Sequence, residues 1–304
     1  MPVLRAFRDG FFSTLAHLRT VGALYLANLL VSLLLILPLA MLLDESIGHS
    51  EASGLASTFD LDFLIDFLNS NAAALRTYWI VVGYGAAAYL LLGSFLTGGV
   101  IDSLHSPGRS AYLSRFFGGC GKYFFRFLRL TPFALAALAA LAWTNSRLNL
   151  LLERYFHGTT MEQEAFWAMR AKQVLLLALL MLLGAVLDTA RIQAVFLGST
   201  RMTARFIASL FFVLANLRRV FLLYALLALL GLAAFVPYFL IARALPAGSV
   251  LLLLLAQQAI IWFRMGMRVC TVASQMSLVQ SSGEPPTAAA FASVLGRARR
   301  ERVT

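Results

Sequence analysis

The stretch LANLRRVFLLYALLALLGLAAFV (residues 214–236) passes directly from a basic segment into a long apolar run. The apolar part lacks the alternation of apolar and polar residues that a strand of an outer-membrane barrel requires. As a helix, an apolar run of about 18 residues or more can cross a hydrocarbon core about 30 Å thick. The stretch therefore predicts a transmembrane helix that begins next to a basic segment at the membrane surface.

The composition of the whole chain agrees with this local pattern. Of its 304 residues, 60% are hydrophobic and only 13% are charged, and the mean hydropathy is +0.80. A water-soluble domain has roughly a quarter of its residues charged, so the surplus apolar surface is expected to face lipid. We predict an all-α integral membrane protein that forms a single membrane domain over residues 1–304. Its six predicted transmembrane helices lie at residues 20–43, 77–101, 131–150, 173–196, 220–243 and 247–268.

The net charge of +11 is distributed unevenly between the connections. One set holds 19 Lys and Arg against 5 Asp and Glu, and it comprises residues 1–19, 102–129, 188–219 and 264–304. The opposite set holds 6 Lys and Arg against 9 Asp and Glu, and it comprises residues 44–76, 146–172 and 243. The positive-inside rule then predicts a protein of the bacterial cytoplasmic (inner) membrane with both termini in the cytoplasm. This topology explains the charge without a nucleic-acid partner; the alternative is a basic patch for anionic lipid headgroups or DNA.

A basic amphipathic segment, here called an elbow, precedes each odd-numbered span. In RSAYLSRFFGGCGKYFFRFLRL (109–130), helical spacing puts four cations on one stripe opposite a phenylalanine-rich face. A helix of this kind is typical of one lying in the membrane interface. Residues 2–20 and 200–219 have the same character. The cations expected to contact anionic lipid headgroups are Arg115, Lys122, Arg126, Arg129, Arg201 and Arg205.

Two of the elbows resemble each other in sequence. LAHLRTVGALY (15–25) and LANLRRVFLLY (214–224) match at seven of eleven positions, whereas FRFLRLTPFAL (125–135) keeps only Leu128 and Arg129 in register. The pattern predicts three elbow-plus-hairpin repeats; the alternative is a shared topology without an internal duplication. The predicted boundaries are 1–104, 105–199 and 200–280, followed by a basic cytoplasmic tail at 281–304.

Polar side chains at membrane depth are costly and therefore mark candidate functional positions. One interpretation is that these side chains have structural roles. Arginines near the end of a span extend to the lipid headgroups, and an ion pair offsets part of the free-energy cost of burying its charges. Amide side chains form hydrogen bonds between helices. The other is a polar site or pathway for an anionic solute or lipid headgroup. The candidates for this intramembrane polar site are Asn28, Asp188, Arg191, Gln257, Gln258, Arg264 and Arg268.

No sequence pattern assembles a catalytic, cofactor or metal site. Glu153 and His157 stand four residues apart and could both reach one metal ion, but no third ligand is evident nearby. Metalloprotease, nucleophile-elbow, P-loop and dinucleotide-binding motifs are all absent from the sequence. We therefore expect no cofactor, no metal and no enzymatic activity.

The stretch GGVIDSLHSPGRSAYLSRFFGGCGKYFFRFLRL (98–130), together with the paired spans around it, resembles poorly characterised bacterial six-helix membrane families. These include the membrane domain that accompanies some glycerophosphodiester phosphodiesterases. The resemblance implies a six-helix architecture over most of the chain. It carries no catalytic residue, because the spans and elbows account for all 304 residues and leave no counterpart of the phosphodiesterase domain.

These features predict a non-enzymatic accessory or scaffold subunit that engages membrane lipids through its elbows, with a protein partner or as a homo-oligomer. The alternative is a transporter or permease for a small solute or lipid, which internal repeats and intramembrane polar residues favour. An intramembrane enzyme ranks third because no catalytic constellation is found.

Overall fold

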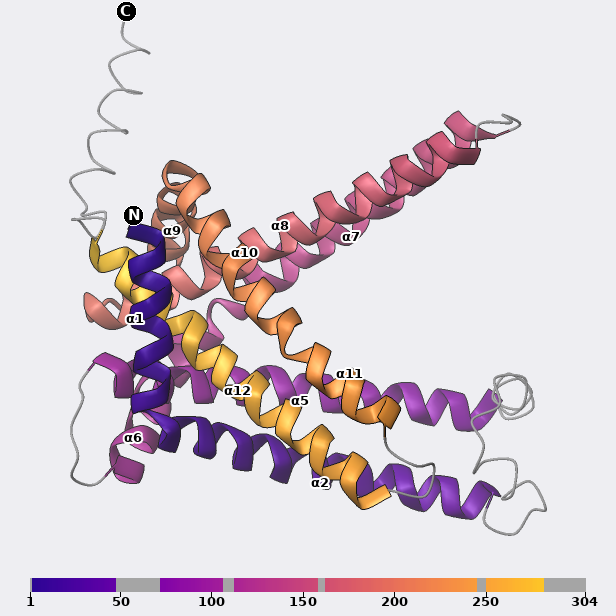
Figure 1. Ribbon diagram of the computed structural model, residues 1–304, viewed down its shortest axis with the longest axis horizontal. Helices are drawn as coiled ribbons and strands as arrows, with labels where there is room; N and C mark the ends of the chain where they lie inside the picture. Colours follow the sequence, from indigo (N-terminus) through magenta and orange to yellow (C-terminus); the bar gives the residue numbers. More distant parts are fainter. Residues whose placement is uncertain (1, 48–71, 106–111, 158–161, 245–249, 282–304) are drawn as a thin grey trace, which may run out of the picture.

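The computed structural model describes residues 2–47, 72–105, 112–157, 162–244 and 250–281, which form helices and contain no strand (Figure 1). This confirms the all-α prediction. The predicted basic tail lies outside the described residues except for Ser281. The helices are α1 (Pro2–Ala16), α2 (Leu18–Ile47), α5 (Ala72–His105), α6 (Tyr112–Leu128), α7 (Thr131–Phe156), α8 (Glu162–Phe196), α9 (Met202–Ala215), α10 (Leu217–Ala233), α11 (Phe235–Ala244) and α12 (Val250–Ser281).

The long helices indicate a membrane-embedded protein. In the described part of the chain, four segments are long and apolar enough to span a membrane: 80–105, 131–156, 163–196 and 217–241. Helix α1 and the first half of α2 qualify as a fifth if the bent pair is counted as one span. The predicted number of six is not confirmed. Helix α12 is not among these segments.

The three amphipathic segments fold as the short helices α1, α6 and α9, each of which leads into a long helix after a break of one or two residues. The α1–α2 pair is bent by 73° at His17. The His17 ring donates from Nδ1 to the Ser13 carbonyl at 2.8 Å, and Asn216, at the α9–α10 break, donates from Nδ2 to the Phe212 carbonyl at 3.2 Å. At both breaks, therefore, a side chain bonds the carbonyl four residues earlier, which also accepts the backbone N–H of the same residue.

The long helices spread apart from the end at which the short helices lie. Figure 1 shows the α7–α8 hairpin directed away from α2, α5, α11 and α12. No residue of α7 is buried, and the buried residues of α8 begin at Ala185. The hairpin therefore exposes apolar side chains over most of its length, as a helix surrounded by lipid does.

The core lies where the short helices meet the adjoining ends of α2, α5, α8, α10 and α12; we call this region the junction. Its side chains form two buried apolar clusters. Phe116, Cys120 and Phe127 of α6 belong to the first, and Val3 and Ala6 of α1 to the second. The short helices thus bury one face in protein and are not simply attached to a lipid surface.

Glycines allow the short helices to dock closely. A Cβ atom on Gly99 of α5 would lie 2.7 Å from the Phe116 carbonyl oxygen, and one on Gly119 of α6 would lie 2.7 Å from Asp102 Cβ. On α1, a Cβ atom at Gly10 would lie 2.7 Å from the Ser274 backbone nitrogen of α12. The absence of a side chain at Gly119 therefore lets α6 approach the Asp102 side chain of α5 closely.

Replacing Gly99 by Ala should destabilise the protein, because the added methyl group meets backbone and the buried Cys120 sulfur. Overpacking of this kind costs about 1–3 kcal/mol. Gly93→Ala is the matched control on α5, since its Cβ has no neighbour within 4 Å; it should be neutral or slightly stabilising. Thermal unfolding in detergent measures both, and equal midpoints for the two variants would contradict close α5–α6 packing.

Candidate functional site

The most developed polar site lies in the junction, between α8, α10 and α12. Asp188 and Arg191 of α8 form an ion pair with Nη1 and Oδ1 3.1 Å apart. Tyr224 of α10 donates its hydroxyl to Gln275 Oε1 at 2.9 Å and lies 3.4 Å from Asp188 Oδ2. The Gln275 amide in turn donates to Thr189 Oγ1 at 2.6 Å. We call these five residues the junction polar cluster.

The cluster ties three helices together in an apolar environment. Gln275 and Thr189 are almost fully buried, whereas the side chains of Asp188 and Arg191 retain 23% and 17% of their exposure. Hydrogen bonds between membrane helices stabilise them by about 1 kcal/mol each. The Asp188–Arg191 ion pair is therefore less completely enclosed than the Thr189–Gln275 part of the cluster.

Arg268 adds a second cation beside the cluster. Its guanidinium donates to Thr97 Oγ1 of α5 at 2.7 Å and is near enough to Arg191 to interact with it electrostatically. Together with Arg191 it gives this region two arginines against one carboxylate in the junction polar cluster, that of Asp188. Arg191 Nε is buried and has no hydrogen-bond partner in the described part of the chain. The arrangement suits an anion better than a cation.

Gln193, one turn beyond Thr189 on α8, is also unusual. It is fully buried, yet neither atom of its amide has a partner among the described residues. Buried polar groups are nearly always hydrogen-bonded, so a bound water or ligand atom is expected beside this amide.

The other predicted intramembrane residues do not join the cluster. Gln258 accepts a hydrogen bond from Tyr25 of α2 at 2.8 Å, which matches the interhelical role weighed for it. Gln257 and Arg264 are exposed, and Asn28 is half-buried. Gln258 precedes Arg268 by ten residues, which is about 15 Å along a helix. Of the residues predicted for an intramembrane polar site, therefore, only Asp188, Arg191 and Arg268 lie together.

The cations of the elbows remain accessible for the most part. Arg115, Lys122, Arg129 and Arg201 are exposed, and Arg126 and Arg205 are half-buried. Arg126 donates to the Gly198 carbonyl at 3.4 Å and lies over the Tyr123 ring, as does Lys122. The basic face of α6 therefore stays outside the core while Phe116 and Phe127 are buried.

The two cysteines are buried and unpaired. Burial raises the pKa of the Cys120 thiol to about 11, with smaller opposing contributions from backbone hydrogen bonds, so the thiol is protonated near neutral pH. Such a thiol is a poor nucleophile and a poor metal ligand. Glu153 and His157 acquire no further partner: within the described ranges, no three His, Cys, Asp or Glu residues could share a metal ion.

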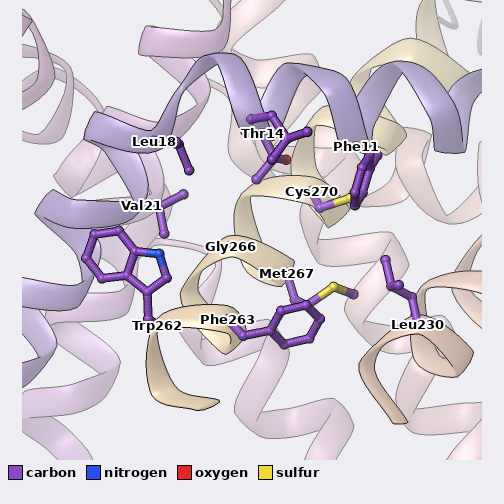
Figure 2. A pocket seen from close by; sticks show the side chains of 11 residues that line it. Phe11, Thr14, Leu18, Val21, Leu230, Trp262, Phe263, Gly266, Met267 and Cys270 are labelled. Carbon is purple, nitrogen blue, oxygen red and sulfur yellow. The ribbon is translucent and has the colours of Figure 1, made fainter. Parts of the chain in front are cut away.

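A small apolar cavity lies beneath the α1–α2 bend. Its volume is about 160 Å³. Figure 2 shows Phe11, Thr14 and Leu18 from the bend on one side, and Trp262 and Met267 of α12 on the other. The Thr14 hydroxyl is engaged with the Gly10 carbonyl at 2.8 Å, and no charged residue lines the cavity. The cavity is therefore an apolar space with no side chain that would orient a polar ligand.

Tyr224, Gln275, Thr189 and Thr97 were not among the predicted site residues. The predicted sixth span ended at residue 268, whereas α12 continues to Ser281 and so carries Gln275 into the junction. The sequence holds one signal for Tyr224: it ends the stretch 214–224, at the position that Tyr25 occupies in the similar stretch 15–25.

No family model, curated protein or solved structure matches the chain.

Replacing Tyr224 by Phe should destabilise the junction, because it leaves the Gln275 Oε1 acceptor without its donor. The expected loss is about 1–3 kcal/mol. Tyr84→Phe on α5 is the matched control, since Tyr84 is 74% exposed. Chemical or thermal unfolding in the same detergent compares the two variants. A Tyr224→Phe protein as stable as Tyr84→Phe would show that the hydroxyl does not support the junction.

Proposed function

We propose that this protein is a non-enzymatic scaffold or accessory subunit of the bacterial cytoplasmic membrane, which engages anionic lipid headgroups through its elbow helices. The observation that carries the proposal is the division of α6 into two faces. Phe116 and Phe127 are buried in the core, while Arg115, Lys122 and Arg129 are exposed. Since the short helices lie beside the ends of the long ones, this basic face falls at the membrane surface when the long helices cross the bilayer.

The distribution of charge supports a cytoplasmic position for the elbows and both termini. The similar side-chain hydrogen bonds at the His17 and Asn216 breaks support a repeated elbow-plus-hairpin unit, with three copies over residues 1–280. The exposed apolar α7–α8 hairpin provides a surface for lipid, for a protein partner or for a second copy of the chain.

Neutralising the α6 cations should weaken the preference for anionic lipid. We expect the variant Arg115→Gln/Lys122→Gln/Arg126→Gln/Arg129→Gln to lose most of the enrichment of phosphatidylglycerol over phosphatidylcholine around the protein. Each cation near an anionic surface contributes about 1 kcal/mol at low salt. Quantifying the lipids that co-purify from mixed vesicles measures the enrichment at two salt concentrations.

The matched control removes four cations from the other end of the molecule. The variant Arg147→Gln/Arg154→Gln/Arg170→Gln/Lys172→Gln changes the net charge equally, but on the α7–α8 hairpin. It should keep the enrichment. If both variants behave alike, net charge and not the elbow determines lipid preference, and the proposal is wrong.

The second candidate function is a permease for an anionic solute. The junction polar cluster and its neighbours favour it: Asp188 and Arg191 form a partly exposed ion pair, Arg268 lies near Arg191, and the buried Gln193 amide on the same helix as the pair has no partner among the described residues. Secondary transporters hold their substrates at helix ends and at polar side chains that packed helices enclose.

This alternative predicts flux of radiolabelled inorganic phosphate into proteoliposomes, and its loss in Arg191→Gln. Arg170→Gln is the control, because Arg170 is exposed and bonds only Gln173 in the described structure. Flux no greater than that of protein-free liposomes would contradict a phosphate permease and would leave the scaffold proposal intact.

A further inference from the structure

An apolar groove lies between α8 and α10, near the break that separates α9 from α10. Leu182 of α8 forms one wall, and Leu217, Phe221 and Leu222 of the first turns of α10 form the other. The groove is open to the surroundings and has a volume of about 450 Å³. It is thus larger and more open than the apolar cavity at the α1–α2 bend.

Both walls belong to segments that can span the membrane, namely 163–196 and 217–241. Leu217, Phe221 and Leu222 are 42–46% exposed, while their neighbours Val220 and Leu223 are buried in the core. The groove therefore has partly exposed apolar walls and opens toward the medium that surrounds the spans. In a membrane that medium is hydrocarbon.

One cation stands at the end of this apolar surface. Arg218 lines the groove, is exposed, and is the second residue of α10, so it lies where the span begins. No carboxylate of the described residues forms a salt bridge with it. The adjacent Arg219 does not line the groove, and its guanidinium is 3.4 Å from Asn216 Oδ1.

We propose that this groove is a binding site for one anionic phospholipid, with an acyl chain along Leu182, Phe221 and Leu222 and the phosphate paired with Arg218. The proposal rests on the function proposed above and names a specific site within it. Charge complementarity decides the occupant: an apolar chain that ends in a negative headgroup matches an apolar groove that ends in an unpaired arginine. A protein segment would have to supply the same combination, and it would meet competition from the lipid already present.

The test is native mass spectrometry of the full-length protein titrated with phosphatidylglycerol or phosphatidylcholine in a mild detergent. The wild-type protein should retain one phosphatidylglycerol more tightly than any phosphatidylcholine. Arg218→Gln should lower the affinity of that lipid about tenfold, because a hydrogen-bonded charge pair is lost. Arg219→Gln, one residue away, should leave it unchanged.

A second pair of variants tests the apolar part. Leu222→Trp fills the groove and should displace the lipid, whereas Leu229→Trp places the same bulk on an exposed site of α10 outside the groove. A phosphatidylglycerol with a photoreactive acyl chain should also label residues 217–222 of the unmodified protein. This last measurement does not depend on how any variant folds.

The outcomes separate the site from the wider proposal. Equal affinities for Arg218→Gln and Arg219→Gln, or photolabelling elsewhere only, would overturn the groove. If phosphatidylglycerol is then still enriched through the α6 cations, the scaffold proposal survives. A wild-type protein that retains both lipids equally and shows no enrichment would contradict both. Labelling of 217–222 blocked by a co-purified protein would assign the groove to that partner instead.

Discussion

This structure depends on one constraint: an amphipathic helix must bury its apolar face and keep its other face beside polar groups. Helix α6 meets it by docking Phe116 and Phe127 against α5, while its cations stay outside the core. The docking is close because Gly99 and Gly119 remove the Cβ atoms that would keep the backbones apart. Helix α1 does the same against α12 at Gly10. The core therefore forms at one end of the long helices.

This placement of the core explains why the rest of the molecule spreads apart. Helices outside the junction have few apolar partners within the chain, and α7 has no buried residue at all. In water such a hairpin would be unstable, whereas in hydrocarbon apolar side chains lose nothing by facing lipid. The same divergence leaves the groove between α8 and α10, because Leu182 and Phe221 are close enough to line one space but are not packed into the core.

The junction combines apolar packing with a connected set of polar side chains. Tyr224 and Gln275 join α10 to α12, and Gln275 joins α12 to α8. Because these bonds are made where little water competes, they specify which helices meet. The cations lie at different depths: Arg191 is partly enclosed beside Asp188, while Arg218 is exposed at the start of a span. A ligand inside the junction and a lipid at its edge would therefore use different arginines.

The sequence alone determined the features that depend on neighbours within a few turns. Apolar runs predicted long helices, and the spacing of Arg115 and Lys122 predicted an amphipathic α6, because helical periodicity is local. Tertiary structure decided what depends on segments far apart in the chain. It brought Tyr224 and Gln275 to Asp188, left Gln257 exposed, and placed Arg218 but not Arg219 in a groove. Two adjacent arginines look alike in a sequence, and only the packing of α8 against α10 distinguishes them.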